Sequence, residues 1–176
     1  MVLKKGRAFP IIITVILIII IVYLFANIKQ PYVECSNTTT NSLGIEITEN
    51  IKVDLSNNNI SKMDLTKTIV LPENYLTEEK NYLSTLNYAL ENSYEYLPKK
   101  TVELNQESDR VIAHITVEDD ETVILNNIEF IDGDSGLQIM INANTKAPDV
   151  VTLQVGDSYT EGEFMTHMKN NGYSCK

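Results

Sequence analysis

The sequence of residues 45–71, IEITENIKVDLSNNNISKMDLTKTIVL, alternates apolar and polar side chains on both sides of an asparagine-rich turn. Apolar residues recur from Ile45 to Leu55, with Glu49 as the only lapse, and the alternation continues from Met63 to Leu71. A period of two is typical of a strand with one buried face. The intervening residues 56–59 favour a turn because Asn tolerates a positive φ. The stretch therefore predicts a long antiparallel hairpin.

The period becomes helical after Pro72, which breaks the second strand. Residues 75–96 place their apolar side chains within one arc of about 120° at 100° per residue. The arc consists of Tyr75, Leu76, Tyr82, Leu83, Leu86, Leu90, Tyr94 and Leu97. Tyr88 points away from it, and Pro98 ends the pattern. The sequence therefore predicts one long helix whose tyrosines line the core.

The second half of the chain favours further strands and one short helix. Strand-like runs occupy residues 101–106, 111–117, 122–131, 137–142 and 150–155. Thr160 and Glu163 have the spacing of a capping box at the start of a helix. Gly172 is a suitable stop at the end of the same helix. This order predicts an α+β fold, an antiparallel sheet of about five to seven strands with one long helix and a short C-terminal helix on one face.

Residues 10–28, PIIITVILIIIIVYLFANI, form an almost continuous apolar run without a charge. As a helix, roughly 18 such residues span about 27 Å, close to the hydrocarbon thickness of a bilayer. Lys4, Lys5 and Arg7 precede the run and favour a cytoplasmic N-terminus. The run is longer than the apolar core of a signal peptide, and residues 24–28 offer no small-x-small cleavage site. An uncleaved signal anchor is therefore favoured over a cleaved signal peptide.

The predicted layout is a single-pass membrane protein with an extracytoplasmic domain. Residues 1–9 form a basic cytoplasmic tail, residues 10–28 the transmembrane helix, residues 29–43 a polar linker, and residues 44–176 the exported domain. The first 30 residues carry four of the 14 Lys and Arg and no acid. The rest of the chain contains the other ten Lys and Arg and all 24 Asp and Glu, which gives it a net charge of −14. Such a surface repels phosphate backbones, so no nucleic-acid partner is expected.

Cys35 and Cys175 are the only cysteines, and they stand at the two ends of the predicted exported domain. A pair of cysteines in an exported domain indicates a structural disulfide. A redox-active pair and a metal site are the alternatives, but the chain has no Cys-x-x-Cys and no His near Cys35.

Several short motifs together resemble one group of bacterial proteins. They are Cys35-Ser36 after the apolar run, the turn sequence of residues 55–63, the tyrosine-rich end of the predicted helix at residues 93–97, and the final Gly172-Tyr173-Ser174-Cys175-Lys176. The chain resembles small lipoproteins and membrane-anchored proteins of Firmicutes related to the YehR-like domain of unknown function. It departs from their pattern over residues 119–155. The resemblance implies no established activity or ligand, so no functional residue is carried over from it.

Few residues offer catalytic or metal-binding chemistry. Asp132 and Asp134 have the spacing that opens a calcium loop, but Gly136 and Ala143 occupy two later ligand positions, so a hairpin turn is favoured over a metal site. His114 and His167 are too far apart in the sequence to indicate a metal centre. Neither a nucleophile elbow nor a glycine-rich phosphate loop occurs, and no cofactor is expected.

Three functional hypotheses follow from the sequence. The first is a non-catalytic membrane-anchored domain that binds a protein or envelope partner outside the cell. The second is an accessory subunit that contacts a membrane complex through residues 10–28. The third is a cation-binding protein or an enzyme that uses the acidic turns at residues 118–121 and 132–134.

Overall fold

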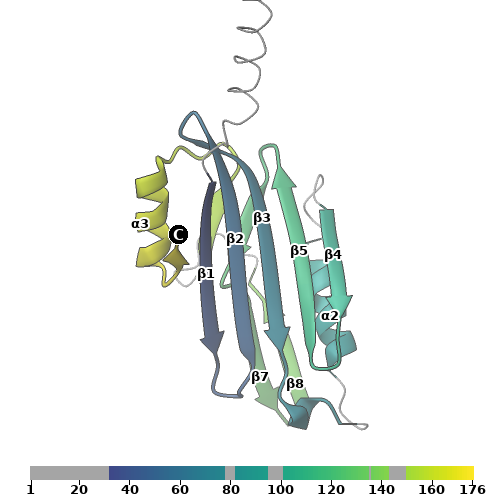
Figure 1. Cartoon of the computed structure of the whole chain (residues 1–176). Coiled ribbons are helices and arrows are strands. Elements are labelled where there is room, and N and C mark those ends of the chain that lie inside the picture. Colours follow the sequence, from purple (N-terminus) through teal and green to yellow (C-terminus); the bar gives the residue numbers. More distant parts are fainter. Residues whose placement is uncertain (1–31, 78–81, 95–100, 135, 143–149) are drawn as a thin grey trace, which may run out of the picture. The chain divides into compact units, whose positions relative to one another are not determined.

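A six-stranded antiparallel sheet forms the frame of the part of the chain that the computed structural model describes, residues 32–77, 82–94, 101–134, 136–142 and 150–176 (Figure 1). In spatial order its strands are β10 (Ser174–Cys175), β1 (Tyr32–Thr40), β2 (Glu46–Ser56), β3 (Asn59–Val70), β5 (Arg110–Glu118) and β4 (Thr101–Gln106). Two smaller ribbons pair β6 (Thr122–Leu125) with β9 (Val151–Gln154) and β7 (Ile128–Gly133) with β8 (Gly136–Ile141).

The predicted hairpin is confirmed as β2 and β3, the two central strands. Asn57 and Asn58 form its turn with φ of 52° and 61°, as the asparagine run indicated. The register shifts by one residue between Asp54 and Leu55, and beyond this irregularity the strands pair regularly to Glu46 and Val70. The shift decides which side chains face each other across the hairpin.

The helical prediction for residues 75–96 is wrong in extent. A 3-10 helix, η1, spans Glu73–Tyr75, and the α-helix α2 covers only Leu83–Ser93. Tyr75 lies in η1, outside α2. Its ring is buried, and its hydroxyl lies 3.0 Å from the carboxylate of Asp132. Leu83, Leu86 and Leu90 form the buried face of α2 as the apolar arc predicted, and Tyr88 is 66% exposed.

The short C-terminal helix is confirmed as α3 (Glu161–Asn170). Thr160 accepts from the backbone of Glu163 while the Glu163 side chain accepts from the backbone of Thr160, the reciprocal bonds of a capping box. Gly172 has a φ of 88°, which suits the stop predicted there. Phe164 and Met168 bury the inner side of the helix.

The predicted α+β class is wrong, because the fold is mostly β. Of the described residues, 56% lie in strands and 19% in helices. One face of the six-stranded sheet packs on α2 and the two ribbons (Figure 1), and their apolar side chains join a single core with Phe164 and Met168 of α3. The ribbons therefore cover much of the surface that the prediction assigned to a long helix.

Two further expectations are corrected. The stretch expected as a linker, residues 29–43, contains β1, because its β-branched threonines pair with β2 from Tyr32 opposite Asp54 to Thr40 opposite Glu46. The single strand expected at residues 122–131 is divided into β6 and β7 by Asn126, whose φ is 54°.

The predicted tail and membrane-spanning segment, residues 1–9 and 10–28, lie outside the described residues. Among the helices of the described part, none has the length and apolar character needed to cross a bilayer.

Candidate functional site

A lysine and a glutamate face each other inside the core at the centre of the sheet. Glu49 of β2 and Lys67 of β3 are direct register partners, and both point to the face that also carries Leu65 and Ile69. Lys67 is 0% and Glu49 is 2% exposed. Lys67 Nζ lies 2.7 Å from Glu49 Oε1. Charged side chains are almost never buried to this extent without partners, so the pair demands a complete set of contacts.

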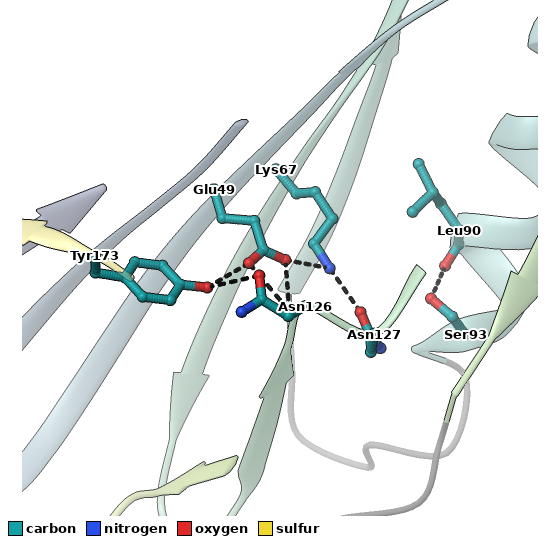
Figure 2. Close-up of polar contacts among 7 residues, drawn as sticks. All are labelled: Glu49, Lys67, Leu90, Ser93, Asn126, Asn127 and Tyr173. Atoms are coloured by element: carbon teal, nitrogen blue, oxygen red, sulfur yellow. Dashed lines mark hydrogen bonds and ion pairs between the residues drawn. The ribbon is translucent and has the colours of Figure 1, made fainter. Parts of the chain in front are cut away.

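The link between β6 and β7 supplies partners from the opposite side of the core (Figure 2). Lys67 Nζ donates to Asn127 Oδ1 at 2.7 Å, and the Asn126 backbone N–H lies 3.2 and 3.1 Å from the two oxygens of Glu49. The positive φ of Asn126 turns the chain so that its N–H and the next side chain reach the pair.

Tyr173 completes the cluster from the segment after α3. Its buried hydroxyl donates to Glu49 Oε2 and also lies 3.3 Å from Asn126 Oδ1. Glu49 thus receives bonds from a lysine, a tyrosine and a backbone amide, which together occupy the accepting positions of a carboxylate. The buried Glu49, Lys67, Asn127 and Tyr173, together with Asn126 at their exposed edge, are called the buried polar cluster below.

The electrostatics of the cluster follow from its burial. Burial opposes the charged form of Lys67, but Tyr94 and the Glu49 carboxylate outweigh it and raise the pKa of the lysine. Burial, together with Glu49, also raises the pKa of Tyr173, which therefore stays a neutral donor. Lys67 rests as an ammonium that contacts the Glu49 carboxylate and donates to the Asn127 carboxamide.

A cleft of about 230 Å³ opens beside the buried polar cluster. Its walls come from the ends of β1 and β2 and from the β6–β7 link. Its lining residues are Asn37, Thr39, Ile47, Glu49, Asn126, Asn127 and Ile128. Lys67 is not among them, although its partner Asn127 is. The cluster therefore has a dry side, which holds the lysine, and a side that opens to the cleft.

The cysteines predicted to pair do so. Cys35 of β1 and Cys175 of β10 form a disulfide with their Cα atoms 4.1 Å apart, and they are register partners in the sheet. The bond closes a sequence separation of 140 residues and fixes β10 against the edge of β1. Tyr173, two residues earlier, is thereby held near Glu49.

The predicted metal and histidine candidates are not brought together. Asp132 lies at the exposed end of β7 and accepts from Tyr75, while Asp134 lies in the exposed turn between β7 and β8. Within the described ranges, no group of three or more His, Cys, Asp or Glu has the arrangement of a metal site. His114 lies on the outer face of β5 with Nδ1 3.1 Å from Thr66 Oγ1, and the ring of His167 on α3 lies 5.6 Å from the ring of Tyr159 at an angle of 40°.

The buried polar cluster was missed by sequence reasoning, although a signal for it exists. Glu49 interrupts the alternation of β2 and Lys67 interrupts that of β3, and the two interruptions fall opposite each other once the hairpin register is set. Opposite charges at paired core positions indicate an internal ion pair. No comparable signal marks Asn126 and Asn127, because their neighbours form a continuous strand-like run.

Comparisons with protein-family models, curated proteins and solved structures find no match to this chain.

Proposed function

We propose that this chain is a membrane-tethered domain on the outer side of the cell that binds a protein or envelope partner and catalyses no reaction on it. The apolar run of residues 10–28 serves as the tether, with the basic residues before it kept in the cytoplasm. The Cys35–Cys175 disulfide supports an extracytoplasmic place, because such bonds persist in oxidising compartments.

The observation that carries the proposal is a band on the open face of the sheet that holds no Lys, Arg, Asp or Glu from β1 across β2 and β3 to β5. In the described part of the chain no helix or ribbon packs on this face (Figure 1). Two adjacent cross-strand rows lie at its centre. One row consists of Ser36, Asn50, Thr66 and His114 and ends at Glu103 on the edge strand β4, and the next consists of Thr38, Thr48, Thr68 and Ile112.

The band differs from its surroundings in charge. Charged side chains occupy the flanking rows, with Lys62 bridging Asp64 and Glu118 on one side and Arg110 beside Glu107 on the other. A neutral surface of hydroxyls and amides lets a partner approach closely without desolvating charges. Binding at this band would hold the partner at the membrane, so the mechanism is tethering.

The proposal is tested by in-cell cross-linking of the full chain with its native anchor and with residues 11–28 replaced by an unrelated transmembrane helix. A partner captured by both versions supports the exported domain as the binding module. A partner captured only with the native anchor contradicts the proposal, because the apolar helix then makes the contact.

Variants of the band locate the contact. Thr48→Lys with Thr68→Lys places two charges at the centre of the band, and capture should fall by at least tenfold. Thr166→Lys with Asn170→Lys adds the same charge on the exposed side of α3 and should leave capture unchanged. Equal capture by both double variants would exclude the band as the binding surface.

A further inference from the structure

The amine of Lys67, the side-chain amide of Asn127 and the carboxylate of Glu49 meet at hydrogen-bond distance inside the core (Figure 2). Lys67 Nζ lies 2.7 Å from Asn127 Oδ1 and 2.7 Å from Glu49 Oε1. Each of the three residues is at most 4% exposed. An amine held against a carboxamide, with an acid–base group touching the amine, is a set of reactants as well as a hydrogen-bonded cluster.

We propose that Lys67 and Asn127 become joined by an intramolecular amide bond, formed with release of ammonia and assisted by Glu49. The site would be a self-modification site that acts once per molecule. This inference does not rest on the proposed binding function, since it concerns only the interior of the domain.

The reaction balances without any further reactant. One proton moves from Nζ of the Lys67 ammonium to Glu49 Oε1, which turns the ion pair into a neutral pair and frees the Nζ electron pair. That electron pair forms a bond to Cγ of Asn127, and the carbonyl π pair moves to Oδ1. The C=O bond then re-forms, the Cγ–Nδ2 bond breaks, and the proton on Glu49 goes to Nδ2. Glu49 then accepts a second proton from Nζ and keeps it. The products are therefore a secondary amide, one ammonia and a protonated Glu49.

The first proton transfer starts from the ammonium, which is the resting form of Lys67, and burial lowers the cost of the transfer. A buried ion pair has lost the hydration of both charges, whereas the neutral acid and amine lose much less on burial. Glu49 Oε1 is already in contact with the proton it must accept. General acid–base catalysis needs this geometry, a group within about 2.6–3.2 Å of the proton it moves.

Positioning supplies most of the remaining rate. Lys67 extends from a central strand, where its backbone is fixed between its register partners Glu49 on β2 and Ala113 on β5. The main chain of Asn127 is held by the Asn142 N–H, which donates to the Asn127 carbonyl at 2.7 Å. Reactants fixed in this way reach effective concentrations on the order of 10⁵ M or more in favourable cases.

Water is excluded from the amine but not from the leaving group. Lys67 is fully buried, so no water competes with it for the Asn127 carbon. Asn127 also lines the cleft, whose other walls include Asn37 and Thr39. The ammonia released from Nδ2 therefore has a route to solvent through this cleft.

The alternative is a static ion pair, and the two states differ in mass. The full chain should be purified under non-reducing conditions and weighed intact. The proposal expects a mass lower than that of the disulfide-bonded sequence by one ammonia, about 17 Da. Trypsin should then release residues 63–80 joined to residues 111–146, because the modified Lys67 is no longer a cleavage site.

Variants assign the roles. Asn127→Ala and Glu49→Gln should both abolish the loss of ammonia, the first by removing the carbon that is attacked and the second by removing the base. Asn37→Ala, which changes another wall of the same cleft, should retain the loss completely. Circular dichroism and the presence of the disulfide confirm that each variant is folded.

Two results would overturn the inference. One is an unmodified intact mass in folded wild-type protein after prolonged incubation at 37 °C. The other is a loss of ammonia that persists in folded Asn127→Ala, which would place the modification elsewhere. If Glu49→Gln fails to fold, the peptide analysis of the wild-type chain alone decides the question.

Discussion

Glu49 shows what a single buried charge requires of its surroundings. Lys67, Tyr173 and the backbone of Asn126 approach it from three separate parts of the chain, at sequence separations of up to 124 residues. A carboxylate taken out of water is tolerated only when such donors replace its hydration. The residue therefore connects the central hairpin to the β6–β7 link and to the segment after α3.

Replacing Tyr173 with Phe tests this role without changing the shape of the core. The variant leaves Glu49 Oε2 short of a donor, and we expect the free energy of unfolding to fall by about 1–3 kcal/mol. Denaturant unfolding of the wild-type and variant chains measures the difference. Tyr88→Phe removes the same hydroxyl at an exposed position of α2 and should change the stability by less than about 0.5 kcal/mol.

The same tyrosine predicts a dependence on alkaline pH. Burial first and Glu49 second raise the pKa of Tyr173 in the folded protein, whereas the unfolded chain loses the phenolic proton near pH 10. Above about pH 10 the folded state thus binds more protons than the unfolded state, and stability falls as pH rises. Wild type should lose more stability than Tyr173→Phe between pH 9 and about 11. Parallel slopes for the two proteins would contradict the assignment.

At the scale of the element, α3 depends on its first turn. Thr160→Ala removes the hydroxyl that accepts from the Glu163 backbone at 3.3 Å, and we expect a loss of about 1 kcal/mol in the free energy of unfolding. Thr166→Ala removes a hydroxyl on the same helix that bonds only to the Gly162 carbonyl one turn back. That control should be nearly neutral, and equal losses in the two variants would argue against a capping effect.

Glu163 adds an acid dependence to the same helix. Its bonds with the backbone and then the hydroxyl of Thr160 lower the pKa of the carboxyl. The stabilisation is therefore complete above the unfolded pKa of about 4.3 and is lost as pH falls through the lower folded value. Thermal unfolding between pH 6 and about pH 3 should show a steeper decline for wild type than for Glu163→Gln. If the thermal stability of Glu163→Gln falls more steeply with decreasing pH than that of wild type, the result contradicts a lowered pKa of Glu163.

The elements predicted correctly are those whose signals are local. The β2–β3 turn follows from three consecutive asparagines, and the start of α3 follows from Thr160 and Glu163. The sequence of β1 favours a linker, because its polar threonines gain their strand character only by pairing with β2. The separation of β6 from β7 depends on one backbone angle at Asn126, in a run whose composition favours a continuous strand.

The candidate site could be predicted only in part, for a related reason. The lapse at Glu49 is visible in the sequence, but its meaning depends on the hairpin register, which the irregularity at Asp54 shifts by one residue. The contact with Asn127, 60 residues away from Lys67, depends on how the ribbons pack on the sheet. Tertiary packing, which no local pattern encodes, therefore decides the chemistry of the site.

At the scale of the whole molecule, the disulfide lies at the edge of the sheet where the backbone pairing is shortest. The Cys35–Cys175 bond joins β10 to β1 at one edge of the sheet, and the buried polar cluster joins the central hairpin to the β6–β7 link. β10 contributes only two residues to the sheet, so the disulfide provides what its few backbone bonds do not. The domain nevertheless has an extended core of its own, which spans both halves of the described chain.

The double variant Cys35→Ala with Cys175→Ala should therefore fold but be less stable. Cross-linking across 140 residues limits the unfolded chain, and the chain-entropy model gives about 5 kcal/mol as the upper value of the loss. Denaturant midpoints of the variant, of oxidised wild type and of wild type in reductant measure it. We expect the variant and the reduced protein to unfold together at a lower midpoint, because both lack the same constraint. If oxidised and reduced wild type unfold at one midpoint, then β10 is held by Tyr173 and the sheet alone, and the disulfide adds no stability.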